Sequence, residues 1–220
     1  MNSRVDTRKI VMIGMFSALA FIMAWLGGLI PIKVANILSY DPKDIIIVIA
    51  GFILGPLSAI AISVITSFLE LITISTTGII GFIMNIISTC FFAIPAIVIY
   101  QRKRTFARAI IGLCVGIASM CVAMMIWNYL ITPLYIVGAT REMVAKMLPT
   151  VFLPFNLVKG ALNASLAMLL YKPVVNAMRQ ARLLDKAPKK KNEVKILLII
   201  CCLMIVVVSV LGLLILGGKI

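Results

Sequence analysis

The chain consists of long apolar runs separated by short polar segments, and the length of each run is the main structural signal. A helix needs about 20 apolar residues to cross the hydrocarbon core of a bilayer. The second and third apolar runs are short because Gly55 and Pro56 interrupt a longer stretch. The sequence predicts an all-α integral membrane protein with a six-helix transmembrane bundle, whose helices cover residues 10–30, 45–54, 57–74, 82–100, 109–130 and 151–171.

Two further segments follow the predicted bundle. Residues 1–173 are assigned to the bundle as one membrane domain. Residues 174–195 are rich in Lys and Arg and are predicted to form a basic cytoplasmic linker. The apolar run within residues 196–217 is again long enough to cross the bilayer. The pattern therefore predicts an additional transmembrane helix at the C-terminal end.

Composition and charge support a membrane protein over a soluble one. Hydrophobic residues make up 63% of the 220 residues, and the mean hydropathy is +1.17. Soluble domains are roughly 45–50% apolar. The formal net charge of +14 would suggest nucleic acid as a partner of a soluble protein, but here the basic residues gather at the ends of apolar runs. That pattern predicts membrane lipid, and not nucleic acid, around the chain.

The distribution of Lys and Arg predicts the orientation in the membrane. With the N-terminus in the cytoplasm, the cytoplasmic segments hold 15 of the 21 Lys and Arg residues. Cytoplasmic loops of membrane proteins carry such an excess of positive charge. We therefore expect a multi-pass protein of a bacterial cell membrane with a cytoplasmic N-terminus.

Several classes of chemistry are disfavoured by what the sequence lacks. It has no histidine, and its five cysteines lie inside apolar runs without metal-ligand spacing. It has no GxxxxGK[ST] phosphate loop. A membrane enzyme would have to rely on Glu70, Asp41 and Asp44, which are not spaced like a metal site. We expect a protein that is not an enzyme and that needs no cofactor.

The apolar run 151–171 contains a lysine, which calls for a compensating partner. An ionised lysine at the centre of a membrane helix costs about 2.5–3.5 kcal/mol on insertion scales. Asn156, Lys159 and Asn163 are spaced i, i+3 and i+7, so they share one helix face. Lys159 either extends to the outer interface or lines a polar pocket, where Glu70 or an aspartate is its expected partner.

Polar residues of three other segments are predicted at the same depth as Lys159. Together they would supply amides, hydroxyl groups and a lysine, which suits a neutral ligand that forms hydrogen bonds. These residues are Tyr40, Asp41 and Asp44 in the first outer loop, Asn85 early in the fourth span, and Asn128, Tyr129 and Thr132 at the end of the fifth.

Small residues recur along the first apolar run. Ala20 and Ala24 are four residues apart, and such pairs let another helix approach closely. The pattern does not decide between packing inside the chain and an interface with a partner subunit, and we keep both hypotheses.

The chain resembles a known family at this level of detail. The stretches that carry the resemblance are "SALAFIMA", "YDPKDIIIVIAGFILGPLSA", "STTGIIGFIMNI", "AIPAIVIYQRKRT", "WNYLITPLY" and "PFNLVKGALNASLAMLLYKP". Together they span residues from about 10 to 173. The chain is similar to the substrate-binding (S) component of energy-coupling factor (ECF) vitamin transporters, most closely to the riboflavin-specific component. The additional helix at 196–217 departs from the family, which usually ends after six helices.

The resemblance implies a ligand site and partner subunits. It implies that riboflavin, as the transported ligand, binds at the outer face of the membrane for ATP-driven uptake. It implies Asn128, Asn156 and Lys159 as flavin ligands, with Tyr40 and Asn85 as weaker matches, and Thr132 is added as a neighbour of Asn128.

The first helix would dock, through Ala20 and Ala24, on a transmembrane coupling subunit that carries two ATPase subunits. The alternatives are the same transport role for another vitamin or small metabolite, and a membrane subunit without a transport role. Binding of a ligand by the isolated chain would discriminate among them.

Overall fold

The computed structural model describes residues 7–29, 33–34, 38–135 and 140–184, together with 203, 205–210, 212 and 214. Helices dominate these residues, and a two-residue antiparallel ribbon lies in the first loop. In chain order the elements are α1 (Thr7–Leu29), β1 (Lys33–Val34), β2 (Leu38–Ser39), α2 (Lys43–Leu54), α3 (Pro56–Thr73), α4 (Gly78–Arg102), α5 (Phe106–Tyr135), α6 (Arg141–Met147), the π-helical turn η1 (Leu148–Phe152) and α7 (Leu153–Gln180).

The predicted helical membrane protein is confirmed. Within the described residues, five helices are long and apolar enough to cross a bilayer, namely α1, α3, α4, α5 and the continuous unit from α6 to α7. The remaining predicted helix of the six, at 45–54, corresponds to α2, which has only 12 residues. Its side chains at Ile47, Val48 and Ile49 are fully buried, because α1, α3, α4 and α7 pack around it. A short helix is tolerated here since protein, and not lipid, surrounds it.

The break between α2 and α3 lies where the sequence predicts it. Gly55 has a φ of +100°, a conformation that L side chains rarely adopt. Pro56 follows as the first residue of α3, where its missing N–H is not needed. The Gly-Pro pair therefore ends one helix and starts the next without a loop.

Small residues set the closest helix contacts. On α5, a Cβ atom added at Gly112 or Gly116 would lie 2.7 or 2.2 Å from backbone oxygens of α4. On α7, a Cβ atom at Gly160 would lie 3.0 Å from Ile117 of α5. These glycines let backbones approach closely, which is how membrane helices gain packing energy. Of the three, Gly160 brings α7 close to α5 one residue away from Lys159.

The predicted partner stripe on α1 lies inside the bundle. Ala20 is fully buried and Ala24 is 6% exposed, so both pack against this chain's own helices. The hypothesis of internal packing therefore fits both residues, and neither is accessible to a partner in this structure. The exposed small residues of α1 include Gly14, Ala18 and Gly28, and a Cβ atom added at Gly14 or Gly28 would meet nothing within 4 Å.

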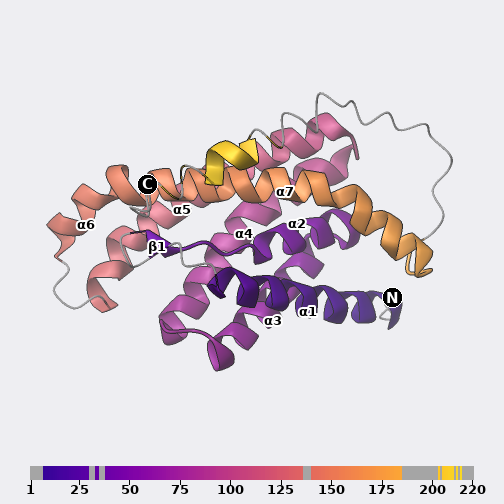
Figure 1. The fold of residues 1–220 in the computed structure, drawn as a ribbon, viewed down its shortest axis with the longest axis horizontal. Helices are drawn as coiled ribbons and strands as arrows, with labels where there is room; N and C mark the ends of the chain where they lie inside the picture. The colour runs from indigo at the N-terminus through magenta and orange to yellow at the C-terminus, as the bar shows by residue number, and fades with distance from the viewer. Residues whose placement is uncertain are drawn as a thin grey trace, which may run out of the picture.

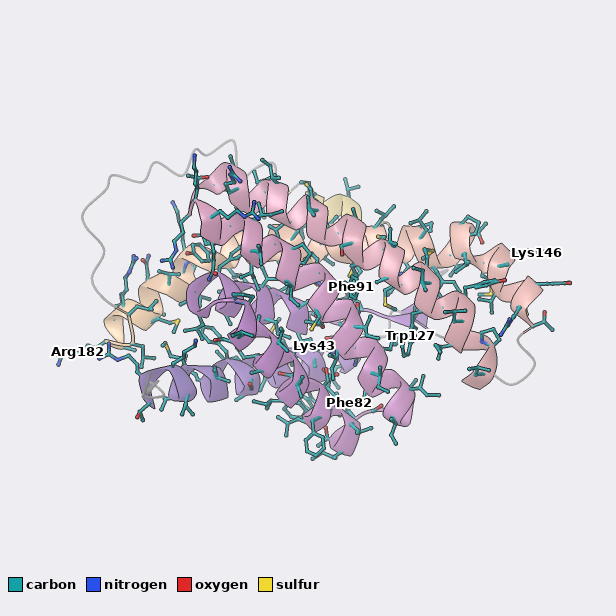
Figure 2. All side chains as sticks on the ribbon, turned by 180° about the vertical axis from the view of Figure 1, so that it is seen from behind. Lys43, Phe82, Phe91, Trp127, Lys146 and Arg182 are labelled. Atoms are coloured by element: carbon teal, nitrogen blue, oxygen red, sulfur yellow. The ribbon has the colours of Figure 1, made fainter. Side chains whose placement is uncertain are left out.

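The two ends of the bundle differ. The first residues of α1 and the end of α7 lie at one end, and α6 lies at the other (Figure 1). Arg182 and Lys146 mark these opposite ends (Figure 2). A cluster of buried side chains from Leu38, Tyr40, Val144, Phe152, Phe155 and Leu162 forms a separate small core toward the α6 end.

The C-terminal part differs from the prediction in the position where the last long helix ends. α7 continues to Gln180, so the first residues of the predicted linker are helical. Residues 185–202 lie outside the described part of the chain. The described residues between 203 and 214 are helical and lie along α7 (Figure 1). A seventh transmembrane helix over 196–217 stays a prediction, because many of its residues are not described.

Candidate ligand-binding site

Lys159 of α7 has a buried acidic neighbour. Its Nζ atom lies 3.6 Å from Oδ2 of Asp44, which belongs to the first turn of α2. Lys159 is 8% exposed and Asp44 is fully buried. A buried charge is retained where an opposite charge lies close to it. The partner expected for this lysine is therefore Asp44, and not Glu70.

Asp44 also accepts hydrogen bonds from two other helices. The hydroxyl of Thr89 on α4 donates to Oδ1 at 2.6 Å. The side-chain amide of Asn163 on α7 donates to Oδ2 at 3.4 Å. Charge-assisted hydrogen bonds of this kind stabilise a buried carboxylate. Asp44 thus holds α2, α4 and α7 together at the level of Lys159.

Tyr40 and Asn163 join the first loop to α7. The hydroxyl of Tyr40 donates to Oδ1 of Asn163 at 2.7 Å, and the Asn163 amide donates to the backbone oxygen of Asp41 at 3.4 Å. Burial raises the pKa of Tyr40 above its ordinary value, and the negative charges of Asp44 and Asp41 raise it further. The phenol therefore stays protonated and remains a hydrogen-bond donor at neutral pH.

A second lysine lies beside this cluster. Nζ of Lys43 contacts Asp41 in the turn before α2 and Oε2 of Glu70 on α3, the latter at 2.8 Å. The same Glu70 oxygen accepts a hydrogen bond of 2.8 Å from the amide of Asn85 on α4. Asn85 therefore belongs to a network that includes a residue, Lys43, which was not among the predicted site residues.

The ionisation of Asp41 is controlled by these lysines. Burial alone would raise its pKa, but the positive charges of Lys43 and Lys159, together with hydrogen bonds from Lys43, outweigh that effect. The pKa of Asp41 lies below its usual value. The carboxylate is therefore charged at neutral pH and keeps its contact with Lys43.

The other three predicted residues make local contacts within their own helices. Asn128 donates to the backbone oxygen of Met124 at 2.7 Å, and Thr132 donates to Oδ1 of Asn128 at 3.0 Å. Asn156 donates to the backbone oxygen of Phe152 at 2.8 Å. All three side chains are buried. Each amide has a second N–H, so the contacts described here do not use its full capacity for hydrogen bonds.

The structure brings together some of the predicted residues and leaves others apart. Hydrogen bonds and ion pairs connect Tyr40, Asn85 and Lys159 through Asp41, Asp44, Glu70, Lys43 and Asn163. Asn128 and Thr132 contact each other, and no contact described here links them or Asn156 to Lys159. The sequence signal that could have singled out Lys43 is its place between two aspartates at the start of an apolar run. Thr89 gives no such signal, because an isolated threonine is common in membrane helices.

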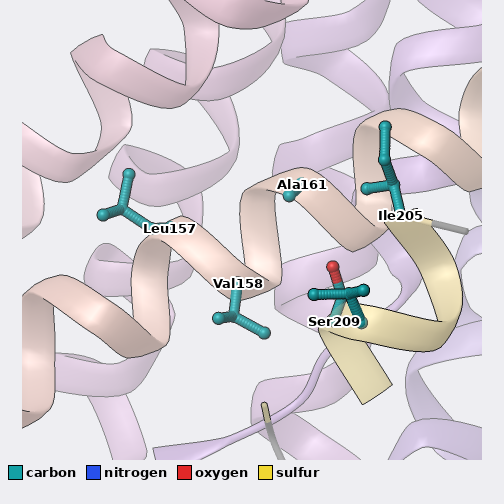
Figure 3. Close-up of a pocket in the computed structure, with 6 residues that line it drawn as sticks. Leu157, Val158, Ala161, Ile205 and Ser209 are labelled. Carbon is teal, nitrogen blue, oxygen red and sulfur yellow. The ribbon is translucent and has the colours of Figure 1, made fainter. Parts of the chain in front are cut away.

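An apolar groove on the opposite face of α7 is a poor candidate for a polar ligand. Leu157, Val158 and Ala161 line it on α7, and Ile205, Val208 and Ser209 line it on the C-terminal segment (Figure 3). Residues 157 and 161 lie on the side of the helix away from Lys159. Among the described residues that line it, Ser209 is the one with a polar side chain. The polar cluster around Lys159 is therefore the better candidate site.

The described residues form a bundle of membrane helices with buried amides and charged groups, which are chemically suited to hydrogen bonds with a polar ligand. The family model described as "ECF transporter, substrate-specific component" matches residues 8–171. The chain belongs to this family. Family members are transporter components, which confirms that the chain is not an enzyme and that the family resemblance is correct.

Curated relatives and a solved structure agree with this assignment. The chain is 28% identical over 190 residues to riboflavin transporter FmnP of Bacillus subtilis (strain 168), covering 81% of this chain and all of that protein. It is 26% identical over 180 residues to riboflavin transporter RibU of Staphylococcus aureus (strain TCH60), covering 80% and 94% of the two chains. A structure described as the S component of a bacterial ECF transporter matches with a TM-score of 0.66 and 27% identity, covering 79% of this chain and 98% of that chain.

Proposed function

We propose that the chain binds riboflavin at the outer face of a bacterial membrane for ATP-driven uptake. Two relatives that are covered almost completely are named riboflavin transporters. The observation that carries the proposal is the buried Lys159, whose face of α7 also presents Asn156 and Asn163. These groups belong to the segments that resemble the riboflavin-specific component.

The chemistry of riboflavin suits this set of groups. One edge of its ring system carries two carbonyl oxygens and an N–H group, so it needs both donors and acceptors. The ammonium of Lys159 and the amides of Asn128 and Asn156 supply donors for carbonyl oxygens, and amide oxygens accept from the N–H. The rings of Tyr40 and Phe155 belong to the same small core and offer aromatic surface to a flat ligand.

Lys159 has N–H groups available to donate hydrogen bonds to a neutral ligand. Its separation of 3.6 Å from Asp44 is an ion pair, but it is longer than a normal hydrogen bond. The charge is therefore compensated while the N–H groups are not committed to this partner. A carbonyl oxygen of the ligand could accept from Lys159 without removing the compensating charge of Asp44.

Uptake would require partner subunits. The sequence carries no GxxxxGK[ST] phosphate loop, which fits a division of labour in which a coupling subunit and two ATPase subunits supply the energy. Since Ala20 and Ala24 are buried, we place the coupling interface on the exposed face of α1 that carries Gly14 and Ala18. The excess of Lys and Arg favours a cytoplasmic N-terminus, and hence a ligand site near the outer surface.

Titration of the purified chain with riboflavin tests the proposal. The chain in detergent should quench riboflavin fluorescence stoichiometrically, and a preparation that retains the vitamin should be yellow. A colourless preparation that does not quench riboflavin would refute the flavin assignment. A panel of other vitamins would then identify the ligand of the same site.

A further inference from the structure

Lys43 is a buried lysine to which the riboflavin hypothesis gives no role. It is 1% exposed, at the first turn of α2, and it lies among the helices in the middle of the molecule (Figure 2). Transfer of an ammonium group from water to the protein interior is unfavourable, so nearby opposite charges must compensate for the lost hydration. Its contacts should therefore explain why a charge is kept there.

The two carboxylates that Lys43 contacts belong to different parts of the fold. Asp41 lies in the turn that precedes α2, and Glu70 lies near the end of α3. The Asp41 side chain also accepts a hydrogen bond of 3.1 Å from the backbone N–H of Lys43. Glu70 in turn accepts from Asn85 on α4. Through Lys43, the turn is tied to α3 and α4.

The same turn is tied to α7 on its other side. Tyr40 donates to the side chain of Asn163 at 2.7 Å, and the backbone oxygen of Asp41 accepts from the Asn163 amide. The turn is thus held between two groups of helices that are far apart in the sequence. Without the side-chain contacts of Lys43, the turn would lose its tie to α3, whereas the hydrogen bonds from Asn163 on α7 would remain.

The two lysines differ in what they can offer a ligand. Nζ of Lys43 has two carboxylates within 4 Å, one of them at 2.8 Å, so a ligand would have to displace a charged partner. Nζ of Lys159 has Asp44 at 3.6 Å and keeps its donors available. Lys43 is therefore suited to hold protein groups in place, and Lys159 is suited to bind the ligand.

We propose that Lys43 is a positioning residue for the ligand site. By holding Asp41 and Glu70 together it fixes the turn before α2, and so places Tyr40 against Asn163 beside Lys159. The role in ligand retention rests on the proposed riboflavin function. The position of the turn itself can be measured without any ligand.

The test compares Lys43→Met, Glu70→Gln and the double variant Lys43→Met/Glu70→Gln with the wild type. The single Lys43→Met variant leaves two carboxylates uncompensated, whereas the double variant removes one charge of each sign. Lys172→Met is the matched control, since it makes the same chemical change on the distal half of α7. The measurements are the melting temperature, hydrogen exchange of residues 38–42 without ligand, and the association and dissociation rates of riboflavin.

We expect the double variant to melt within a few degrees of the wild type. Its 38–42 segment should nevertheless exchange at least 10-fold faster, and riboflavin should dissociate at least 10-fold faster with an association rate within 3-fold. If the double variant regains wild-type exchange and dissociation together with its melting temperature, Lys43 serves folding only and the proposal is overturned.

Two further outcomes are distinguished by the design. If the wild type does not bind riboflavin, the riboflavin hypothesis fails, and hydrogen exchange alone decides whether Lys43 positions the turn. If the double variant does not fold, Asp41→Asn replaces it, because that change weakens the same contact from the less buried end. Unchanged exchange of residues 38–42 in Asp41→Asn would then overturn the proposal.

Discussion

The hydroxyl of Tyr40 donates a hydrogen bond of 2.7 Å to Asn163, a residue 123 positions later in the chain. This contact joins the first loop to the last long helix, on the face of α7 that also carries Lys159. It places an aromatic ring and an ammonium group at the same depth in the bundle.

Replacement of Lys159 should weaken riboflavin binding strongly. A hydrogen bond to a charged group contributes about 1.5–3 kcal/mol, so Lys159→Met should raise the Kd by about 10- to 150-fold. Fluorescence titration measures the change. Since Asp44 would be left uncompensated, Lys159→Met/Asp44→Asn tests the same loss in a less strained protein. Leu157→Met, on the opposite face of α7, is the control and should bind as the wild type does.

The amides should contribute less than the lysine. A neutral hydrogen bond is worth about 0.5–1.5 kcal/mol, so Asn128→Ala and Asn156→Ala should each raise the Kd by about 2- to 13-fold. Thr132→Val should have a smaller effect, because Thr132 supports Asn128 through a hydrogen bond of 3.0 Å. Equal affinity of all three variants and the wild type would place the ligand away from these helices.

The two faces of α1 should respond differently to bulky residues. Ala18→Trp lies on the exposed face, so it should abolish uptake in cells while the purified protein keeps its riboflavin affinity within about 3-fold. Ala20→Trp should instead lower the melting temperature, since Ala20 is fully buried and overpacking costs about 1–3 kcal/mol or more. Normal uptake by Ala18→Trp would exclude this face as the coupling interface.

The contribution of Asp41 to stability should depend on pH. Its pKa is lowered in the folded protein, so the stabilisation is present above the ordinary pKa of an aspartate and is lost as the pH falls through the lowered value. Wild type should therefore melt higher than Asp41→Asn at pH 7, and the difference should shrink toward pH 3. Thermal unfolding in detergent at both pH values measures it. A difference that is constant with pH would mean that Asp41 does not act through its charge.

Removal of the C-terminal segment should leave ligand binding intact. Every predicted ligand-binding residue lies between Tyr40 and Lys159, and the segment packs on the other face of α7. A chain that ends after residue 184 should bind riboflavin within about 3-fold of the full chain. Because Val206 packs against the small core that contains Tyr40 and Phe155, a lower melting temperature is expected. Loss of binding by a folded truncated protein would show that the segment shapes the site.

Most of the helices were predictable because their signals are local. The Gly55–Pro56 break and the length of the apolar runs depend only on neighbouring residues. The sequence also placed Tyr40, Asn85 and Lys159 at a common depth, since depth follows from the position of a residue along its span. These features could be predicted without knowledge of which helices are neighbours.

The pairing of side chains was decided by the tertiary structure. A helix that is apolar on all sides carries no periodic pattern to show which face is turned inward. The sequence therefore allowed Ala20 and Ala24 either to pack inside the chain or to contact a partner subunit. The rotation of α1 buried both. In the same way, depth alone allowed Glu70 or an aspartate as the partner of Lys159. The orientation of α2 and α7 about their axes places Asp44 next to Lys159, whereas Glu70 forms an ion pair with Lys43.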